Sequence, residues 1–267
     1  MKIVFSDIDG TLLNDNKEIT PKTLYAINEL QKNNIEFVIV SSRPNFGIMP
    51  ILKKYNFNCN IICYGGGVII NKEGKVLFNQ GFLKEEAKEI IDYIENENLD
   101  LVWNLYDIDK WICKDVQNEA IKREEFLINY FAKQGNINSF DGNLPINKIL
   151  CMSKEENSDK YLQILKQRFP NYNIVKSSNI LIEVMPKFNN KGIGVKRMCE
   201  YLNIDSSSSI AFGDNYNDVD MLDVVNQSFL MDNAPKELKE KYKNITLSNN
   251  NDGIYYALCK LNLINKK

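Results

Sequence analysis

The chain has 267 residues, carries 33 Lys+Arg against 35 Asp+Glu for a net charge of −2, and contains no histidine. Without imidazole, Ser-His-Asp and Cys-His nucleophile systems and His-ligated zinc sites are excluded. Interspersed charges of both signs argue against a nucleic-acid-binding surface. The length and ordinary composition indicate a folded soluble protein with one large domain or two modest ones.

The six cysteines show no pattern of a metal or redox site. No two of them have the C-x-x-C spacing, so we expect small buried residues of a protein in the reduced cytosol. No apolar run approaches the ~18 residues of a membrane helix, and no apolar signal segment follows Lys2. These observations predict a cytoplasmic protein that binds no membrane and no nucleic acid.

Short apolar runs alternate with amphipathic stretches in the first quarter of the chain. Strands are predicted over 2–6, 35–40 and 60–63. A helix follows Thr20 and Pro21, which supply an N-cap and a first-turn proline, and another runs from Pro44 to about residue 54. This alternation predicts a parallel sheet covered by helices on both faces.

The pattern changes beyond residue 67. Runs at 68–71 and 76–78 flank a hairpin signal around Gly74. Helices are then predicted at 83–96, 119–134 and 155–168, and strands at 101–104, 148–152 and 180–184. The alternation returns with helices at 191–202, from about 217, at 235–242 and at 253–261, and with strands at 209–212 and 228–231. We predict an α/β protein with a Rossmann-like parallel-sheet core over 1–80 and 186–267 and an inserted α+β domain over 81–185.

Two aspartates stand where the first predicted strand ends, in the sequence Asp7-Ile8-Asp9-Gly10-Thr11. Alternate residues of an extended chain share a face, so Asp7 and Asp9 project together while Ile8 packs the other way. Ligands of open parallel sheets bind beyond the carboxyl ends of the strands. Two carboxylates there favour a hard divalent cation, foremost Mg²⁺ in the cytosol. Alone, however, a D-x-D sequence is more often a solvated turn.

Three further polar segments follow predicted strands or begin a helix. Ser41-Ser42-Arg43 offers hydroxyl donors to an anion, and Gly213-Asp214-Asn215-Tyr216-Asn217-Asp218 adds two carboxylates and an amide. A helix N-terminus disfavours a lysine, so a bound anion would explain Lys191. Separately, a serine turn, a surface lysine and an aspartate N-cap are the more frequent explanations. Together the segments predict a pocket with four acids, one lysine and hydroxyl donors at one sheet edge.

With these segments the chain resembles the haloacid dehalogenase superfamily of phosphohydrolases, and within it the Cof-type subfamily, which carries a large α+β cap between the second and third motifs. The resemblance covers essentially the whole chain. The four motifs are Asp7-Ile8-Asp9-Gly10-Thr11, Ser41, Lys191, and Gly213-Asp214 with Asn217-Asp218; Asn233-Ala234-Pro235 and Asn251-Asp252-Gly253 also look like this subfamily. The first and fourth motifs in order are highly specific, whereas the second and third are weak without them.

The resemblance implies roles for these residues. Asp7 would be the nucleophile that forms an aspartyl-phosphate, and Asp9 the general acid and then base. Phosphoryl oxygens would be held by a set of donors, namely Ser41, Ser42, Lys191 and Asn217. Mg²⁺ would be held by the Asp7 carboxylate, the Asp9 main-chain carbonyl, Asp214, and Asp218 directly or through water.

The chain departs from the subfamily pattern at several positions. The second motif commonly reads Thr-Gly-Arg, whereas here Ser42 replaces the glycine. Where Asn-Gly-Ala is frequent after the third strand, this chain has Tyr64 followed by three glycines, so the Tyr64 hydroxyl is a candidate replacement for a polar substrate contact. Arg43 and Asn233 are further candidate substrate contacts. Asp232 stands where glycine is usual and adds a negative charge of undetermined effect.

The inserted cap is implied to cover the pocket, exclude water and select the leaving group. Its aromatics Trp103, Tyr106 and Trp111 are candidates for the substrate side, although core packing is the commoner role of such residues. The main functional hypothesis is a Mg²⁺-dependent phosphatase of small phosphorylated metabolites, most plausibly sugar phosphates. The alternatives are a phosphosugar mutase, a receiver-like signalling phosphoacceptor and a non-catalytic binding protein. The sequence identifies neither the substrate nor the oligomeric state.

Overall fold

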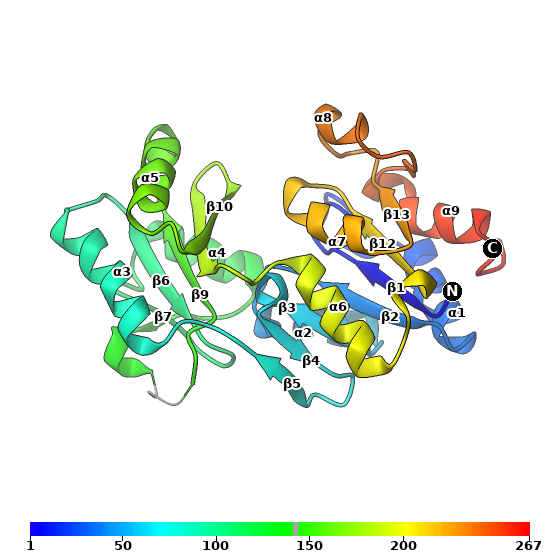
Figure 1. The fold of residues 1–267 in the computed structure, drawn as a ribbon, viewed down its shortest axis with the longest axis horizontal. Helices are drawn as coiled ribbons and strands as arrows, with labels where there is room; N and C mark the ends of the chain where they lie inside the picture. Colours follow the sequence, from blue (N-terminus) through cyan, green and yellow to red (C-terminus); the bar gives the residue numbers. More distant parts are fainter. Residues whose placement is uncertain (141–143) are drawn as a thin grey trace. The chain divides into compact units, whose positions relative to one another are not determined.

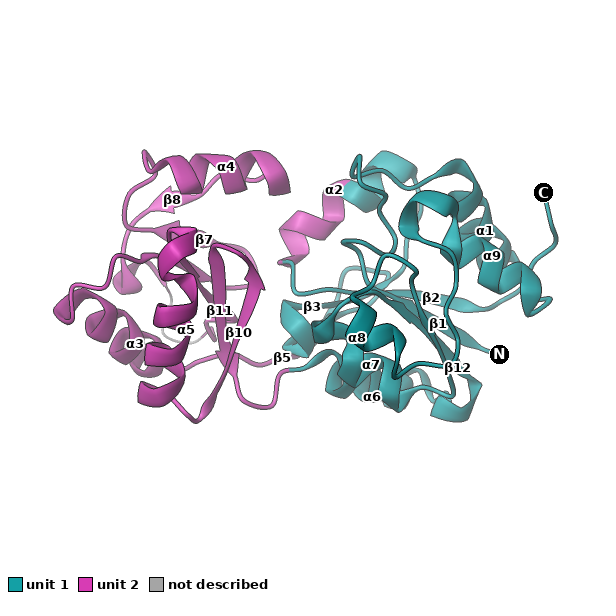
Figure 2. Cartoon of the chain, turned by 90° about the horizontal axis from the view of Figure 1, so that it is seen from above, with its two compact units in different colours: residues 1–43, 51–77, 190–267 teal, residues 44–50, 78–189 magenta. Residues whose placement is uncertain are grey.

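The computed structural model describes residues 1–140 and 144–267, and its chain divides into two compact units (Figure 2). The first unit comprises Met1–Arg43, Ile51–Leu77 and Asn190–Lys267. The second comprises Pro44–Pro50 and Phe78–Asn189. The second unit therefore contains the predicted insert over 81–185, together with a short segment near residue 47.

The first unit is built on a seven-stranded sheet with the order β13-β12-β1-β2-β3-β4-β5 (Figure 1). Its strands are β1 (Ile3–Ser6), β2 (Glu36–Val40), β3 (Asn60–Cys63), β4 (Val68–Ile70), β5 (Val76–Asn79), β12 (Ser209–Gly213) and β13 (Gln227–Leu230). The five strands from β13 to β3 run parallel, and β4 pairs antiparallel with β3. Phe5 of β1 lies between Ala211 and Val38, so the first predicted strand is central.

Helices cover this sheet in two groups, which contain α1 (Pro21–Lys32), α9 (Gly253–Lys260), α6 (Lys191–Leu202) and α7 (Val219–Val224). Helix α8 (Lys236–Lys239) follows β13, and helix α2 (Asn45–Tyr55) is divided between the two units after Pro50. Helix α1 packs with α9, and α6 packs with α7 on the opposite face of the sheet (Figure 2). Thr20 caps α1 by accepting a hydrogen bond from the backbone N–H of Thr23 at 3.2 Å. The predicted doubly covered sheet is confirmed.

The second unit is an α+β arrangement around a six-stranded sheet ordered β10-β11-β9-β6-β7-β8. Its strands are β6 (Val102–Tyr106), β7 (Trp111–Cys113), β8 (Lys133–Gln134), β9 (Lys148–Met152), β10 (Tyr172–Ser178) and β11 (Leu181–Pro186), and its helices are α3 (Lys84–Asn96), α4 (Glu119–Ile128) and α5 (Glu155–Arg168). Ile90 of α3, Leu165 of α5 and Ile149 of β9 share one buried apolar cluster. Burial of this cluster holds α3 and α5 against the sheet.

The predicted helix over 119–134 is shorter in the structure. Helix α4 ends at Ile128 because Asn129 adopts the left-handed conformation, with φ of 52°. The chain then forms β8, which pairs parallel with β7. Strands β7, β8 and β10 are not among the predicted elements.

The three aromatics singled out in the insert are buried. Trp103 is 4% exposed, Tyr106 1% and Trp111 1%. The Trp103 indole N–H donates to Glu95 Oε1 at 3.0 Å, and that of Trp111 donates to Asn104 Oδ1 at 2.7 Å. Buried indoles with satisfied donors are packing residues of this unit.

The longest helix in the described residues, α5, has 14 residues, whereas a membrane span needs about 20. No helix within 1–140 or 144–267 has both the length and the apolar character to cross a membrane.

The six cysteines all lie in the described part of the chain, where none forms a disulfide and all are buried. Burial raises the pKa of Cys59 and Cys151 to about 12, and that of Cys113 and Cys199 to about 11. Because the thiolate is the reactive form, iodoacetamide at pH 8 is expected to leave the native protein unmodified and to label it fully after unfolding in urea. Intact-mass spectrometry measures both states, and rapid alkylation of the native protein would contradict this burial.

Candidate active site

Asp7 and Asp214 lie at the carboxyl ends of two adjacent parallel strands, β1 and β12. Asp7 is 6% exposed, and its N–H donates to the Phe212 carbonyl at 3.0 Å. Asp214 directly follows Gly213, the last residue of β12. The parallel pairing therefore carries both carboxylates to the same edge of the sheet. Ile8 is fully buried, as predicted, but it lies in a turn beyond the end of β1 at Ser6 and not in an alternating strand.

Lys191 begins α6 and is 2% exposed. Its Nζ lies 2.6 Å from Asp7 Oδ1 and 2.5 Å from Asp218 Oδ1. Burial lowers the pKa of Lys191, but the two carboxylates outweigh it and hold the pKa above its usual range. The lysine is therefore a permanent cation. The carboxylates of Asp7 and Asp218 explain its position at the start of a helix without a bound anion.

Asp218 is fully buried at the end of the 3-10 turn η4 (Tyr216–Asp218). Its Oδ1 accepts from Lys191, while its Oδ2 accepts from the backbone N–H groups of Asp214 and Asn215 at 2.9 and 3.0 Å. Gly213 makes this approach possible, because a Cβ there would lie 2.5 Å from the Asp218 Cβ. Both oxygens of Asp218 are therefore engaged in holding its neighbours.

The Asp214 carboxylate is positioned from the first loop. Its Oδ1 accepts from the Thr11 hydroxyl at 2.8 Å, and Asn233 Nδ2 lies 3.4 Å from its Oδ2. Gly10 has φ of +84°, and a Cβ there would lie 2.3 Å from Asp214 Oδ2. The glycine is therefore required both for the turn and for the close approach. Thr11 belongs to the first sequence motif, but this contact with Asp214 was not predicted.

The donor set of this cluster fits a hard divalent cation. The carboxylate oxygens of Asp7, Asp214 and Asp218 lie within 4.8 Å of one another, and a single ammonium, that of Lys191, pairs with two of them. Burial and the negative charge of Asp218 raise the pKa of Asp214 to about 6, and they also raise that of Asp7. The site therefore holds excess negative charge, which an oxygen-ligated cation such as Mg²⁺ would neutralise.

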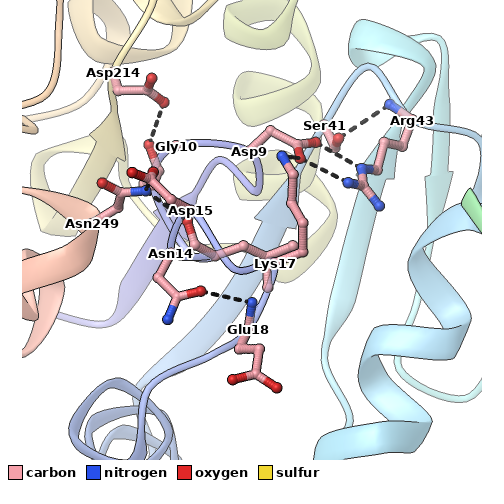
Figure 3. A network of polar contacts seen from close by, with 12 residues as sticks. Asp9, Gly10, Asn14, Asp15, Lys17, Glu18, Ser41, Arg43, Asp214 and Asn249 are labelled. Carbon is pink, nitrogen blue, oxygen red and sulfur yellow. Dashed lines mark hydrogen bonds and ion pairs between the residues drawn. The ribbon is translucent and has the colours of Figure 1, made fainter. Parts of the chain in front are cut away.

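Asp9, which was expected to project together with Asp7, is not part of this group of carboxylates and lies beside Arg43 and Lys17 (Figure 3). Arg43 binds it in bidentate fashion, with Nε 2.7 Å from Oδ2 and Nη2 2.7 Å from Oδ1, and Lys17 Nζ lies 3.0 Å from Oδ1. Burial raises the pKa of Asp9, but Arg43 and Lys17 outweigh it and hold the pKa at about 2. In this arrangement Asp9 is an ionised carboxylate that has no proton to donate.

Ser41 to Arg43 follow β2, beside the first loop. Ser41 is 2% exposed, and its Oγ accepts from the Arg43 N–H at 3.1 Å. Tyr64 has φ of 52° and is fully buried, and its N–H donates to the Arg43 carbonyl at 3.2 Å. Tyr64 therefore supports the Ser41–Arg43 turn from within the core. Ser42 is half-buried in the same turn.

The remaining predicted residues occupy more exposed positions. Asn217 is exposed in η4, one residue before Asp218. Asn233 Nδ2 donates to the Gly10 carbonyl at 2.8 Å, so its structural contacts are with the first loop. Asp232, whose side chain is 62% exposed, forms an ion pair with Lys239 at 2.8 Å. This pair balances the negative charge that Asp232 adds.

The structure thus brings together four residues from three distant segments of the sequence: Asp7, Lys191, Asp214 and Asp218. Besides Thr11, two contributors received no role from the sequence, Lys17 and Asn249. No local sequence pattern distinguishes either residue, because each lies in a loop and its role depends on a partner whose position only the structure gives.

Comparison with known proteins agrees with this geometry. The sequence model for haloacid dehalogenase-like hydrolases matches residues 4–258. A relative from Haemophilus influenzae named "Putative phosphatase" is 32% identical over 259 residues, which cover 96% of this chain and 97% of the relative. The Bacillus subtilis protein named 5-amino-6-(5-phospho-D-ribitylamino)uracil phosphatase YwtE is 28% identical over 287 residues, or 98% of each chain. The crystal structure of TM0651 from Thermotoga maritima has a TM-score of 0.86 at 30% identity, covering 100% of this chain and 98% of that one. The chain belongs to the haloacid dehalogenase-like hydrolases.

Proposed function

We propose that this protein is a Mg²⁺-dependent phosphatase that hydrolyses phosphate monoesters of small metabolites, foremost sugar phosphates, through an aspartyl-phosphate on Asp7. The observation that carries the proposal is the contact of Lys191 Nζ with both Asp7 and Asp218, beside Asp214. One ammonium among three carboxylates at a sheet edge suits a dianionic substrate accompanied by a divalent cation. Membership of a hydrolase family supports the same reaction class.

Asp7 is the proposed nucleophile. Its Oδ1 is held by Lys191, and this contact fixes the direction of the carboxylate. Attack of the other oxygen on phosphorus forms the O–P bond of the aspartyl-phosphate and breaks the bond to the leaving oxygen. Water then attacks the phosphorus, releases phosphate and restores the Asp7 carboxylate.

Phosphoryl oxygens would be held by Lys191 and by donors from two loops, namely Ser41, Ser42 and Asn217. Lys191 remains charged at every physiological pH because Asp7 and Asp218 raise its pKa. A fixed cation of this kind stabilises the charge on the transferred group without reorganisation.

The proposed Mg²⁺ ligands are the carboxylates of Asp7 and Asp214 and the main-chain carbonyl of Asp9. Asp218, whose oxygens accept hydrogen bonds from Lys191 and from two backbone N–H groups, would contribute directly or through water. When bound, Mg²⁺ supplies charge neutralisation for the phosphoryl oxygens. Thr11 holds the Asp214 carboxylate ready for this ligation.

Asp9 is the proposed general acid and base. Its bidentate pair with Arg43 and its contact with Lys17 keep it ionised, so the acid role requires Asp9 to leave these partners and acquire a proton. In the second step the ionised carboxylate accepts a proton from the attacking water.

Asp9→Asn is expected to slow turnover, and more for substrates with alkyl leaving groups than for p-nitrophenyl phosphate, whose leaving group needs no proton. General acid catalysis contributes about 10²- to 10⁴-fold, so kcat/KM for a sugar phosphate should fall by that factor. Steady-state phosphate release on both substrates measures the difference. Equal slowing of the two would remove Asp9 as the acid.

The proposed function is tested by a phosphate-release screen with and without Mg²⁺. The substrates are sugar phosphates, nucleotides, pyridoxal phosphate, flavin mononucleotide and 5-amino-6-(5-phospho-D-ribitylamino)uracil, for which the Bacillus subtilis relative is named. Release of inorganic phosphate that requires Mg²⁺ supports a phosphatase. Conversion of a sugar phosphate into its isomer without phosphate release would instead indicate a mutase, and inertness on every substrate would overturn the proposal.

A further inference from the structure

Asn233 connects three loops around the carboxylate cluster. Its Nδ2 lies 2.8 Å from the Gly10 carbonyl oxygen and 3.4 Å from Asp214 Oδ2, and its Oδ1 accepts from the Asn249 N–H at 3.1 Å. The backbone N–H fixes which end of the amide is the oxygen. The NH₂ group must therefore face the carbonyl and the carboxylate.

The loop that contains Asn249, whose N–H binds Asn233, is also hydrogen-bonded to the first loop. Asn249 is 5% exposed, and its Nδ2 lies 3.0 Å from the Leu13 carbonyl oxygen and 3.1 Å from Asp15 Oδ1 (Figure 3). Asn250 pairs twice with Asp15, at 2.8 and 3.0 Å. The amide of Asn233 is therefore held in place from the side opposite Asp214.

We propose that Asn233 is a positioning residue that holds Asp214 in place for Mg²⁺, an inference that rests on the proposed metal site. Asp214 Oδ1 accepts from Thr11 and Oδ2 from Asn233, so each oxygen has one donor that limits rotation of the carboxylate. Donors of this kind orient a metal ligand before the ion arrives. The role differs from the substrate contact that the sequence suggested for Asn233.

The chain offers a suitable test variant and a matched control. Asn233 is an exposed residue, so Asn233→Ala leaves water access to its former partners and is expected to preserve the fold. Asn244→Ala removes an exposed amide that donates to the Ser228 carbonyl, at 3.2 Å. Neither Asn244 nor Ser228 belongs to the loops that hold Asn233 and Asp214.

Isothermal titration of the substrate-free protein with MgCl₂ measures the role directly. Asn233→Ala is expected to raise the Mg²⁺ dissociation constant about 10-fold, the lower end of the range for outer-shell partners, while Asn244→Ala leaves it unchanged. At saturating Mg²⁺, kcat and the substrate KM of Asn233→Ala should return close to the wild-type values.

Other outcomes overturn the inference. An unchanged Mg²⁺ affinity with a raised substrate KM would make Asn233 a substrate contact, and no change in either would leave it without a positioning role. Wild-type protein that binds Mg²⁺ but releases no phosphate would refute the proposed function alone. Wild-type protein that binds no Mg²⁺ would refute both.

Discussion

Asp7→Asn is expected to lower the rate of phosphate release by at least about 10⁴-fold, because removal of the nucleophile from a set of residues that act together has effects of this size or larger. An amide oxygen does not form the phosphoenzyme, and the variant also loses a carboxylate ligand for Mg²⁺. Acid quenching with ³²P-labelled substrate should trap label on the wild type and none on the variant. Undiminished turnover would remove Asp7 from the mechanism.

The same substitution should not weaken the fold. Burial and the charge of Asp218 raise the pKa of Asp7, so its ionised form opposes folding at neutral pH. The melting temperature of Asp7→Asn in Mg²⁺-free buffer should therefore equal or exceed that of the wild type. The difference should shrink as the pH falls, because the protonated carboxyl of the wild type is then neutral like the amide. Asp220→Asn, which removes the same charge from an exposed position in α7, should retain wild-type turnover.

Lys191→Met is expected to reduce both stability and turnover. The substitution keeps the chain length but leaves the Oδ1 atoms of Asp7 and Asp218, which lie 2.6 and 2.5 Å from Nζ, without their cation. Removal of one partner from a buried ion pair costs about 3–5 kcal/mol, and loss of the phosphate-binding cation should remove turnover as well. Urea unfolding in Mg²⁺-free buffer and phosphate release measure the two effects.

Two comparisons separate charge from packing in this variant. Lys196→Met lies in the same helix at an exposed position and should change the unfolding free energy by no more than about 0.5 kcal/mol. The double variant Asp7→Asn with Lys191→Met should be less destabilised than Lys191→Met alone, because one of the unpaired buried charges is gone. A double variant as unstable as the single would show that lost packing, and not charge, is responsible.

The burial of the central strands could be anticipated from residue type alone. Runs such as Ile3 to Phe5 and Phe37 to Val40 are apolar throughout, and both faces of such strands are buried in a sheet covered by helices on each side. The expected alternation of Asp7, Ile8 and Asp9 could not be carried over in the same way, because β1 ends at Ser6 and Asp9 is not grouped with the other carboxylates. The carboxyl-end position of Asp7 and Asp214, by contrast, needed only the sequence and the rule that parallel strands share an edge.

The inserted unit was harder to predict because its elements are short. Strand β8 has two residues and β7 has three. These are too few for an alternating pattern of apolar and polar residues to be recognised. The end of α4 depends on one residue, Asn129, in a left-handed conformation, and asparagine occurs in many other places in this chain. Local propensity therefore left 129–134 helical in the prediction, whereas pairing with β7 made part of it a strand.

The sequence by itself determined the class of the fold, the family and the four residues that form the charged cluster, because each of these depends on local pattern and on motifs next to predicted strands and helices. Only the tertiary structure decided how that cluster is held, with Thr11 and Asn233 on Asp214 and Asn249 behind Asn233. It also decided that Asp9 is held outside the cluster by Arg43 and Lys17. A hydrogen bond requires its atoms to approach within about 3 Å at a suitable angle. Loops from distant parts of the chain meet at such distances only after the sheet has placed their ends.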